Sequence, residues 1–276
     1  MLTVSLSMPT NDSSGQGYDA IYQDFDTPLQ RQLRREAYGQ DIGQHSWVTA
    51  EDLEADIARL QISRDSRVLD LGCGPAGPLT FMVEQAGCHG VGADFSQPAI
   101  AAGIARVNSQ GLGAQIALQQ ADLNDPLPFA EASFDAVISL DVILHLRDRA
   151  RIFREVARVL LPEGRFLFTD AGVIAGAISD EQIRRRALHG CTQFAPAGFN
   201  ERVLQQEGFR VLETSDRTPS LLRNATGRLT ARLAHRVELE EQESPAGFKQ
   251  QQEYLETIIE LARDGSLKRL MHLAQR

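Results

Sequence analysis

A short segment from Val68 to Gly77 has the clearest chemical character of this chain, because an apolar stretch there ends in an acid and runs into a glycine-rich turn. Gly72, Gly74 and Gly77 have the spacing G-x-G-x-x-G, which lets a backbone turn tightly beneath a nucleotide and start a helix against a sheet. Cys73 lies inside this turn, where we expect it to border the ligand as a small packing residue. The spacing predicts a nucleotide site but does not identify the nucleotide.

Asp70, the acid that ends the apolar stretch, narrows the choice of nucleotide. A carboxylate is unfavourable beside the dianionic pyrophosphate of NAD and favourable beside a cation. S-adenosylmethionine carries an ammonium next to a sulfonium at its amino acid end. The acid therefore favours S-adenosylmethionine as the cofactor, with an NAD-dependent oxidoreductase on a similar sheet as the alternative.

Three further acids, Asp94, Asp122 and Asp141, fall where strands of a parallel sheet should end. Ligands of such sheets bind outside the carboxyl ends of the strands, so these acids should border one crevice. Asp94 lies about twenty residues beyond the glycine turn, where an acid accepts both ribose hydroxyls, and Phe95 is placed to stack on adenine. Asp122 is placed to accept the exocyclic amine of adenine, beside the backbone amide of Leu123. Each acid alone could equally be a helix cap or a solvated strand end; their order together favours binding.

Short apolar segments alternate with helical patterns through the middle of the chain. A parallel sheet covered on both faces requires this alternation, so the sequence predicts an α/β, Rossmann-like, doubly wound fold. The predicted strands are Arg67 to Leu71, Gly90 to Asp94, Ala114 to Gln120, Phe134 to Leu140 and Arg165 to Thr169, followed by Phe209 to Thr214 and an edge strand over 267–273.

The remaining segments are expected to surround this core of residues 62–276. Residues 1–17 are rich in Ser, Asn, Gly and Thr and are predicted to be disordered. Residues 18–61 are predicted to form helices that cover the cofactor. Helical insertions at about 171–208 and 218–264 are predicted to form a lid over the acceptor.

The composition of the chain limits the binding partners and the cellular compartment that we expect. The 276 residues carry a formal net charge of -9, and phosphate binding needs a clustered basic face, so no nucleic acid is expected. The three cysteines form no C-x-x-C pair, which indicates neither a disulfide framework nor a zinc site. No basic leader and no apolar run of membrane-spanning length is present. We expect a cytoplasmic protein with a small-molecule partner and no membrane contact; the sequence does not indicate the oligomeric state.

Five separated motifs resemble, in order, those of a class I S-adenosylmethionine-dependent methyltransferase. The resemblance covers about residues 18–276 and implies a seven-stranded sheet, mostly parallel with an antiparallel last strand. It also implies that Leu140, before Asp141, borders the cofactor. A Pro-Glu-Gly turn at 162–164 departs from the usual Pro-Gly-Gly and affects only a surface turn. The motifs are Val68 to Gly77, Gly92 to Ser96, Ala121 to Leu123, Ser133 to Ser139 and Val159 to Arg165.

Within this class the chain resembles small-molecule methyltransferases of the sarcosine and dimethylglycine, phosphoethanolamine and natural-product sugar O-methyltransferase kind. The segments that carry this resemblance are 22–25, 38–47, 141–146 and 265–271. It implies a small-molecule acceptor, with natural-product biosynthesis as one setting, and that Tyr22, Trp47 and Asp141 border the acceptor or belong to its lid. Core packing of the N-terminal helices explains Tyr22 and Trp47 nearly as well.

His145 is the candidate general base for methyl transfer to oxygen or nitrogen. Its ordinary pKa near 6.5 leaves a neutral, accepting ring nitrogen at cytoplasmic pH. Asp170, at the end of the next strand, is predicted to hold the other ring nitrogen, as the acid of a catalytic triad does. The alternatives are that His145 caps a helix or only shapes the pocket, and an amine acceptor would need no base.

Three further interpretations concern metal, charge and function class. Asp141 and Asp170 could resemble the acidic ligands of a magnesium-dependent methyltransferase, but Ala171 stands where an amide ligand would be needed, so no metal is predicted. The cluster Arg184 to Arg186 fits a solvated helix face or a contact with an anionic acceptor. Besides the oxidoreductase, the alternatives are a C-methyltransferase and a protein that binds the cofactor without catalysis.

Overall fold

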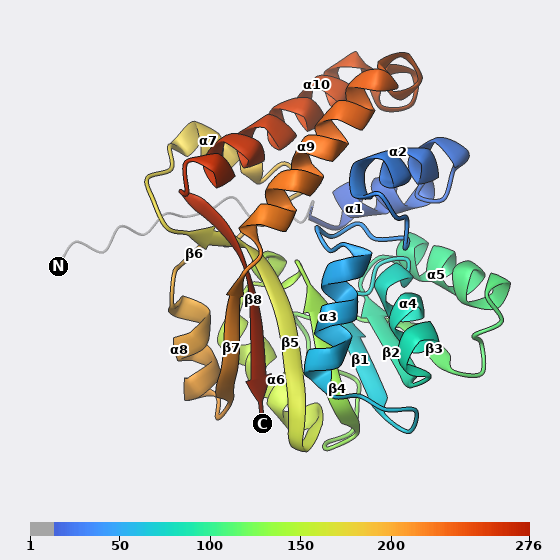
Figure 1. Cartoon of the computed structure of the whole chain (residues 1–276), viewed down its shortest axis with the longest axis vertical. Helices are drawn as coiled ribbons and strands as arrows, with labels where there is room; N and C mark the ends of the chain where they lie inside the picture. Colours follow the sequence, from blue (N-terminus) through green and yellow to red (C-terminus); the bar gives the residue numbers. More distant parts are fainter. Residues whose placement is uncertain (1–13) are drawn as a thin grey trace.

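The computed structural model describes residues 14–276 and places a sheet beneath a layer of helices (Figure 1). The disorder predicted for residues 1–17 falls mostly on residues 1–13, which lie outside the described residues. Helix α1 (Ser14–Gln23) already begins at Ser14. None of the helices between residues 14 and 276 has the length and apolar character needed to span a membrane.

Seven strands follow the order β3-β2-β1-β4-β5-β8-β7, which confirms the predicted doubly wound sheet. β8 is antiparallel to both of its neighbours, and the other strands of this path run parallel to one another. The segment predicted as an edge strand over 267–273 therefore lies inside the sheet, and β7 forms the edge. A two-residue strand, β6 (Ala195–Pro196), pairs with β5 outside this path, so the sheet has eight strands where the sequence predicted seven. The other strands are β1 (Arg67–Leu71), β2 (His89–Asp94), β3 (Ile116–Gln120), β4 (Phe134–Leu140), β5 (Leu160–Ile174), β7 (Arg210–Asp216) and β8 (Leu267–Gln275).

Helices cover both faces of the sheet, because successive strand residues point to opposite sides. Val68 packs with α3 (Ala50–Leu60), α4 (Gly77–Ala86) and α5 (Gln97–Ser109) on one face. Leu69 packs with α6 (Arg149–Val159) and α8 (Phe199–Gln206) on the other. Both faces of the central strands are therefore apolar, as a parallel sheet between helical layers requires.

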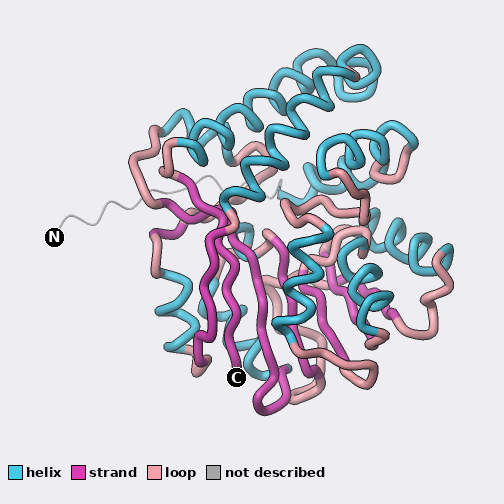
Figure 2. Tube along the Cα trace, in the orientation of Figure 1, coloured by secondary structure: helices cyan, strands magenta, loops and turns pink. Residues whose placement is uncertain are grey.

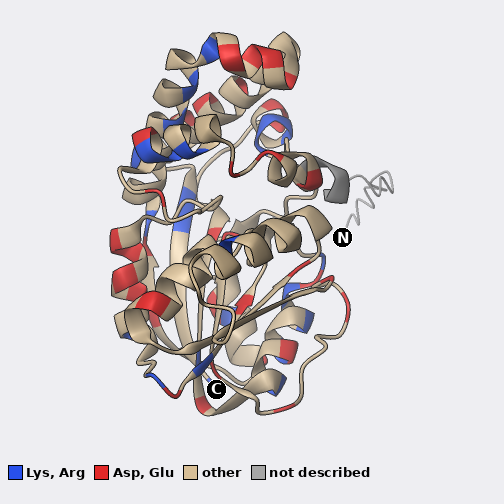
Figure 3. Ribbon diagram, turned by 90° about the vertical axis from the view of Figure 1, so that its right-hand side faces the viewer, with Lys and Arg blue, Asp and Glu red and all other residues tan. Residues whose placement is uncertain are grey.

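A second helical layer lies beyond the sheet (Figures 1 and 2). It contains α1, α2 (Pro28–Tyr38), α7 (Asp180–Arg186), α9 (Thr218–Ala234) and α10 (Arg236–Arg263). α2 packs closely on α9 at Gly227. A Cβ added there would lie 2.4 Å from the carbonyl oxygen of Ala37, so the close approach depends on glycine. α10 is broken at Ser244, which has φ 69°. Acidic and basic segments alternate along the helices of this layer (Figure 3), and some form i,i+4 pairs such as Arg236 with Glu240.

Candidate active site

The glycine turn joins β1 to α4 and forms one wall of a cavity. Gly72 and Gly74 have φ 76° and 51°, a conformation that favours glycine. A Cβ on Gly72 would lie 2.4 Å from the Val142 side chain. Gly77 does not line the cavity. A Cβ there would lie 2.2 Å from the Gly43 carbonyl oxygen, so the third glycine lets the 42–43 segment cross the start of α4.

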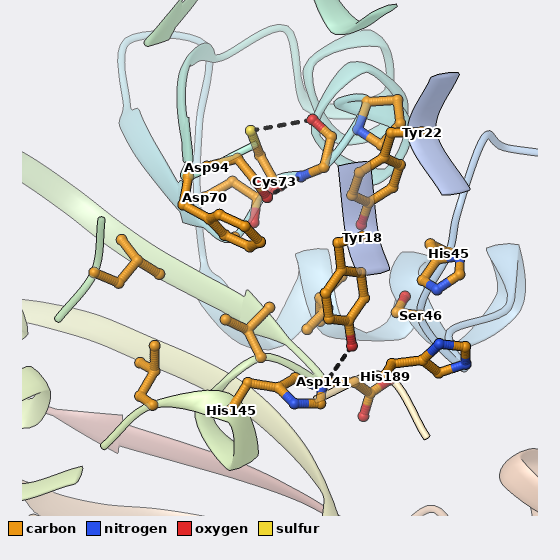
Figure 4. Close-up of a pocket in the computed structure, with 18 of the residues that line it drawn as sticks. Tyr18, Tyr22, His45, Ser46, Asp70, Cys73, Asp94, Asp141, His145 and His189 are labelled. Carbon is orange, nitrogen blue, oxygen red and sulfur yellow. Dashed lines mark hydrogen bonds between the residues drawn. The ribbon is translucent and has the colours of Figure 1, made fainter. Parts of the chain in front are cut away.

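This cavity has a volume of about 330 Å³ and lies at the carboxyl ends of β1, β2 and β4 (Figure 4). Figure 4 shows Asp70 and Asp94 beside Cys73 on one side and His145 on the other, with Tyr18 between them. The structure brings most of the predicted site residues together around it, namely Tyr22, Asp70, Gly72, Cys73, Gly74, Asp94, Phe95, Asp122, Leu123, Leu140, Asp141 and His145.

Asp70 is a buried acid without a partner. Its side chain is 2% exposed, and no hydrogen bond to its carboxylate is formed in the part of the chain that the structure describes. Burial, with a smaller contribution from Asp94, raises the pKa of Asp70 to about 8. A cationic ligand in the cavity would relieve this desolvation, so the site fits the ammonium end of S-adenosylmethionine.

Asp94 ties the glycine turn to the end of β2. One of its carboxylate oxygens accepts a hydrogen bond from the Gly74 backbone N–H at 2.8 Å, and the other accepts one from Ser96 N–H at 2.9 Å. Burial raises the pKa of Asp94 in spite of these donors. A carboxylate has about four acceptor positions, so two are left for ligand hydroxyls.

The far end of the cavity is open and more polar. Phe95 is 38% exposed there. Asp122 accepts hydrogen bonds from the backbone N–H and the side-chain amide of Asn124, at 2.8 and 3.0 Å. Leu123 is buried beside it. This aromatic and acidic end fits an adenine base, as the sequence predicts.

His145 ends a 3₁₀ turn after β4, Ile143–His145. Its Nδ1 lies 2.8 Å from the carbonyl oxygen of Cys191, which cannot donate, so Nδ1 carries the proton. Nε2 is then an acceptor, and the Tyr18 hydroxyl donates to it at 2.9 Å (Figure 4). Burial lowers the pKa of His145, although the bond to Cys191 opposes this shift. The ring is therefore neutral at neutral pH, with an accepting nitrogen in the cavity.

Asp170 does not contact His145, so the predicted pairing of these two residues is wrong. β5 does not end at Asp170 but continues to Ile174, which leaves the carboxylate fully buried beneath α6 and α8. There it pairs with Arg149 and accepts a hydrogen bond from Asn200 at 2.9 Å. Burial alone would raise the pKa of Asp170, but the Arg149 guanidinium and the hydrogen bonds hold it below its usual value. The Cys191 carbonyl takes the orienting role that the sequence assigned to Asp170.

Asp141 lines the cavity, and Trp47 does not. Arg269 and Thr169 each donate to the Asp141 carboxylate at 2.9 Å, and the Trp47 backbone N–H does so at the same distance. Trp47 is 4% exposed and packs in a cluster that includes Tyr254. It borders a smaller adjoining cavity.

Several residues of the site carry no recognisable motif. Tyr18, His45 and His189 all border the cavity, and Arg186 and Arg228 border the smaller one beside it. Tyr18 lies in α1, His45 lies between α2 and α3, and His189 follows α7. Of these residues, the sequence marked only Arg186, within the Arg184 to Arg186 cluster, and the 38–47 segment that contains His45. Among residues 14–276, no group of three His, Cys, Asp or Glu side chains is arranged to hold a metal ion.

The fold and the site together define a class of protein. A glycine turn follows the first strand, an unpartnered acid precedes it, a second acid ends the next strand, and the last strand is inserted antiparallel. These are the features of class I S-adenosylmethionine-dependent methyltransferases. The family model described as a methyltransferase domain matches residues 69–168. The chain belongs to this family.

Similarity to known proteins extends beyond the matched domain. The chain is 31% identical over 173 residues to an O-methyltransferase, rstn1, of Aspergillus nomiae, across 61% of this chain and 76% of that protein. It is 33% identical over 160 residues to a glycine/sarcosine/dimethylglycine N-methyltransferase of Actinopolyspora halophila, across 57% of this chain and 28% of that protein. Its fold is similar to the cyclopropane synthase MmaA2 from Mycobacterium tuberculosis, with a TM-score of 0.81 at 16% identity, across 96% and 100% of the two chains. The chain spans 58% and 60% of the length of two other curated relatives.

Proposed function

We propose that this chain transfers the methyl group of S-adenosylmethionine to an oxygen or nitrogen of a small-molecule acceptor. The observation that carries this proposal is the accepting Nε2 of His145, which faces a cavity whose opposite wall holds the glycine turn and Asp70 (Figure 4). One side of the cavity suits the cofactor and the other suits a nucleophile. Relatives named O- and N-methyltransferases support both acceptor atoms.

The cofactor, when bound, supplies an electrophilic methyl group to an in-line nucleophile. Asp70 balances the positive amino acid end, and Asp94 and Asp122 hold the nucleoside. His145 Nε2 accepts the proton of an acceptor hydroxyl, and the Cys191 carbonyl stabilises the proton on Nδ1 as the ring becomes charged. The Tyr18 hydroxyl occupies the position of that donor in this structure.

The upper helices are proposed to close the site. α1, α2, α7, α9 and α10 would act as a lid that excludes water and positions the acceptor. Of the insertion expected at about 171–208, only α7 would belong to this lid, because α8 packs on the sheet. We also propose a natural-product acceptor and a cytoplasmic location. The free state of Cys73, Cys88 and Cys191 supports a reducing compartment.

Substitution of His145 tests the proposed base. For an oxygen acceptor, His145→Ala should lower turnover roughly 10²- to 10⁴-fold, the usual contribution of a general base. The affinity for S-adenosylhomocysteine, measured by calorimetry, should stay nearly constant. Unchanged turnover on a hydroxyl acceptor would show that His145 is not the base. Methylation of an amine acceptor should be much less affected by the substitution.

Calorimetry with two cofactors tests the class of reaction. S-adenosylhomocysteine should bind and NADH should not, because ionisation of Asp70 is favourable beside an ammonium and unfavourable beside a pyrophosphate. If NADH binds instead, the oxidoreductase alternative holds. If the protein binds S-adenosylhomocysteine but methylates nothing in a metabolite extract supplied with labelled cofactor, a non-catalytic role is favoured.

A further inference from the structure

A small cavity of about 40 Å³ lies on the acceptor side of the site. It shares Tyr18, His145 and Asp141 with the cofactor cavity, so it adjoins the proposed base. Its other wall contains two arginines, Arg186 at the end of α7 and Arg228 in α9. The cavity therefore places two cations close to the position where an acceptor must bind.

Arg186 is a buried cation without a counter-ion. Its residue is 4% exposed, and its guanidinium donates only to the Ala171 carbonyl at 3.1 Å and the Tyr254 hydroxyl at 3.3 Å. Its Nε has no partner, and it forms no ion pair, among the residues that the structure describes. A buried charge that lacks an opposite charge destabilises a fold. A buried arginine at position 186 is explained if a bound ligand supplies the anion that the protein itself does not.

Arg228 adds a second cation to the same cavity. Its guanidinium lies 4.9 Å from the centre of the Trp47 ring, and within residues 14–276 it forms no ion pair. Asp141, the acid that borders this cavity, is already paired with Arg269. Burial, together with the charges of Arg228 and Arg186, lowers the pKa of the neighbouring His189 to about 3, so the surroundings are positive.

We propose that the methyl acceptor carries a carboxylate, which binds between Arg186 and Arg228 in this small cavity. The inference rests on the proposed function and specifies its substrate class. A volume of about 40 Å³ holds roughly three water molecules at ~10–15 Å³ each, which suits a carboxylate better than a phosphate. The rest of the acceptor has room in a larger cavity of about 490 Å³ that Arg228 and His189 also line.

Ligand-observed saturation-transfer NMR with acetate tests this inference. The protein is first saturated with S-adenosylhomocysteine, and acetate, acetamide and inorganic phosphate are compared as probes. Acetate should bind, acetamide should not, and phosphate should bind more weakly than acetate. Arg186→Gln and Arg228→Gln should each weaken acetate binding at least tenfold, because a fixed cation facing the anion is lost. Arg184→Gln, an exposed neighbour on α7, should leave it unchanged.

Three outcomes would overturn the inference. These are equal binding of acetate and acetamide, preference for phosphate, and equal loss in the Arg184→Gln control. Thermal unfolding provides a second readout, since Arg186→Gln should keep or raise Tm if the arginine is retained for binding. A large fall in Tm would show a structural role instead. Calorimetry with S-adenosylhomocysteine separates the two proposals: if it binds while acetate does not, only the carboxylate inference fails.

Discussion

The acids of the site differ in how their charge is balanced. Asp94 accepts two backbone hydrogen bonds, and Asp141 pairs with Arg269, but Asp70 has no partner among the described residues. Its carboxylate borders a cavity rather than a packed interior, which supports the proposed contact with the ammonium end of the cofactor. Burial of Asp70 therefore costs free energy at the position that we propose recognises the cofactor.

Asp70→Asn should stabilise the unliganded protein and weaken cofactor binding. The pKa of Asp70 is about 8 in the folded chain and 3.8 ordinarily, so the folded chain holds an extra proton between these values. The stability that this extra proton contributes to the fold is fully present below pH 3.8 and is lost as the pH rises towards 8. The variant should therefore gain about 1–3 kcal/mol at pH 8, the cost of an unsatisfied buried group, and progressively less towards pH 4.

Thermal unfolding between pH 4 and 8 checks this pH dependence, and calorimetry should show at least tenfold weaker binding of S-adenosylhomocysteine. Asp65→Asn, at an exposed position just before β1, is the control. A difference in Tm between Asp70→Asn and the parent protein that does not change with pH would contradict the argument.

The position of Asp170 between three secondary structure elements explains why we assign it a structural role and not a catalytic one. Its carboxylate connects β5 to Arg149 on α6 and Asn200 on α8, so three elements converge on one buried acid. Arg149 also donates to the Gln193 carbonyl and to Asn200. The network therefore joins β5, α6, α8 and the loop that contains Gln193 into one buried core.

Asp170→Asn should destabilise the fold with little loss of turnover per folded molecule. Removing one member of a buried ion pair costs about 3–5 kcal/mol, which corresponds to a fall in Tm of roughly 6–20 °C at 2–4 °C per kcal/mol. Thermal unfolding and active-site titration measure the two effects. The control is Arg154→Gln, on the same helix as Arg149, which breaks an exposed pair with Glu207 at the end of α8 and should change Tm little. If turnover fell 100-fold with Tm unchanged, Asp170 would have a catalytic role after all.

The elements that depend on local patterns could be predicted from the sequence. The five parallel strands predicted from the sequence fall where the structure has them, apart from their ends. The glycine turn and the acids after β1, β2 and β4 follow from the same local rules. The structural role of Asp170 could not be predicted from local rules, because the length of β5 depends on its pairing with β8, nearly one hundred residues later.

Long-range packing explains why the sequence did not reveal Tyr18 as a site residue and left Arg186 open between a solvated helix face and a contact with an anionic acceptor. Tyr18 reaches His145 across 127 residues, and Arg186 reaches Tyr254 across 68. No local spacing encodes such contacts. The cofactor side of the site can therefore be predicted from the sequence, whereas the acceptor side depends on tertiary contacts that no local pattern indicates.

At the scale of the whole molecule, the site lies between the sheet and the upper helical layer. The sheet supplies the cofactor side, and α1 supplies Tyr18 and Tyr22 from above. α1 contacts the core through Asp19, whose carboxylate accepts a hydrogen bond from the Ser96 hydroxyl at 2.5 Å. α1 also packs on Ala99 of α5, and its Tyr18 and Tyr22 rings lie against the His45 ring beside the cavity. The stability of α1 should therefore depend on what fills the cavity.

Binding of S-adenosylhomocysteine should slow amide hydrogen exchange in α1 more than in any helix packed on the sheet. A ligand between Asp70 and Tyr22 adds contacts to α1 and none to α8, so α1 opens less often once the ligand is bound. Exchange followed by mass spectrometry, with peptides of α8 as the internal reference, measures the difference. Equal protection of both helices would indicate a general gain in stability, and no protection of α1 would show that it is not part of the lid. Tyr22→Ala, which removes one contact between α1 and the ligand, should reduce the protection of α1 while leaving α8 unchanged.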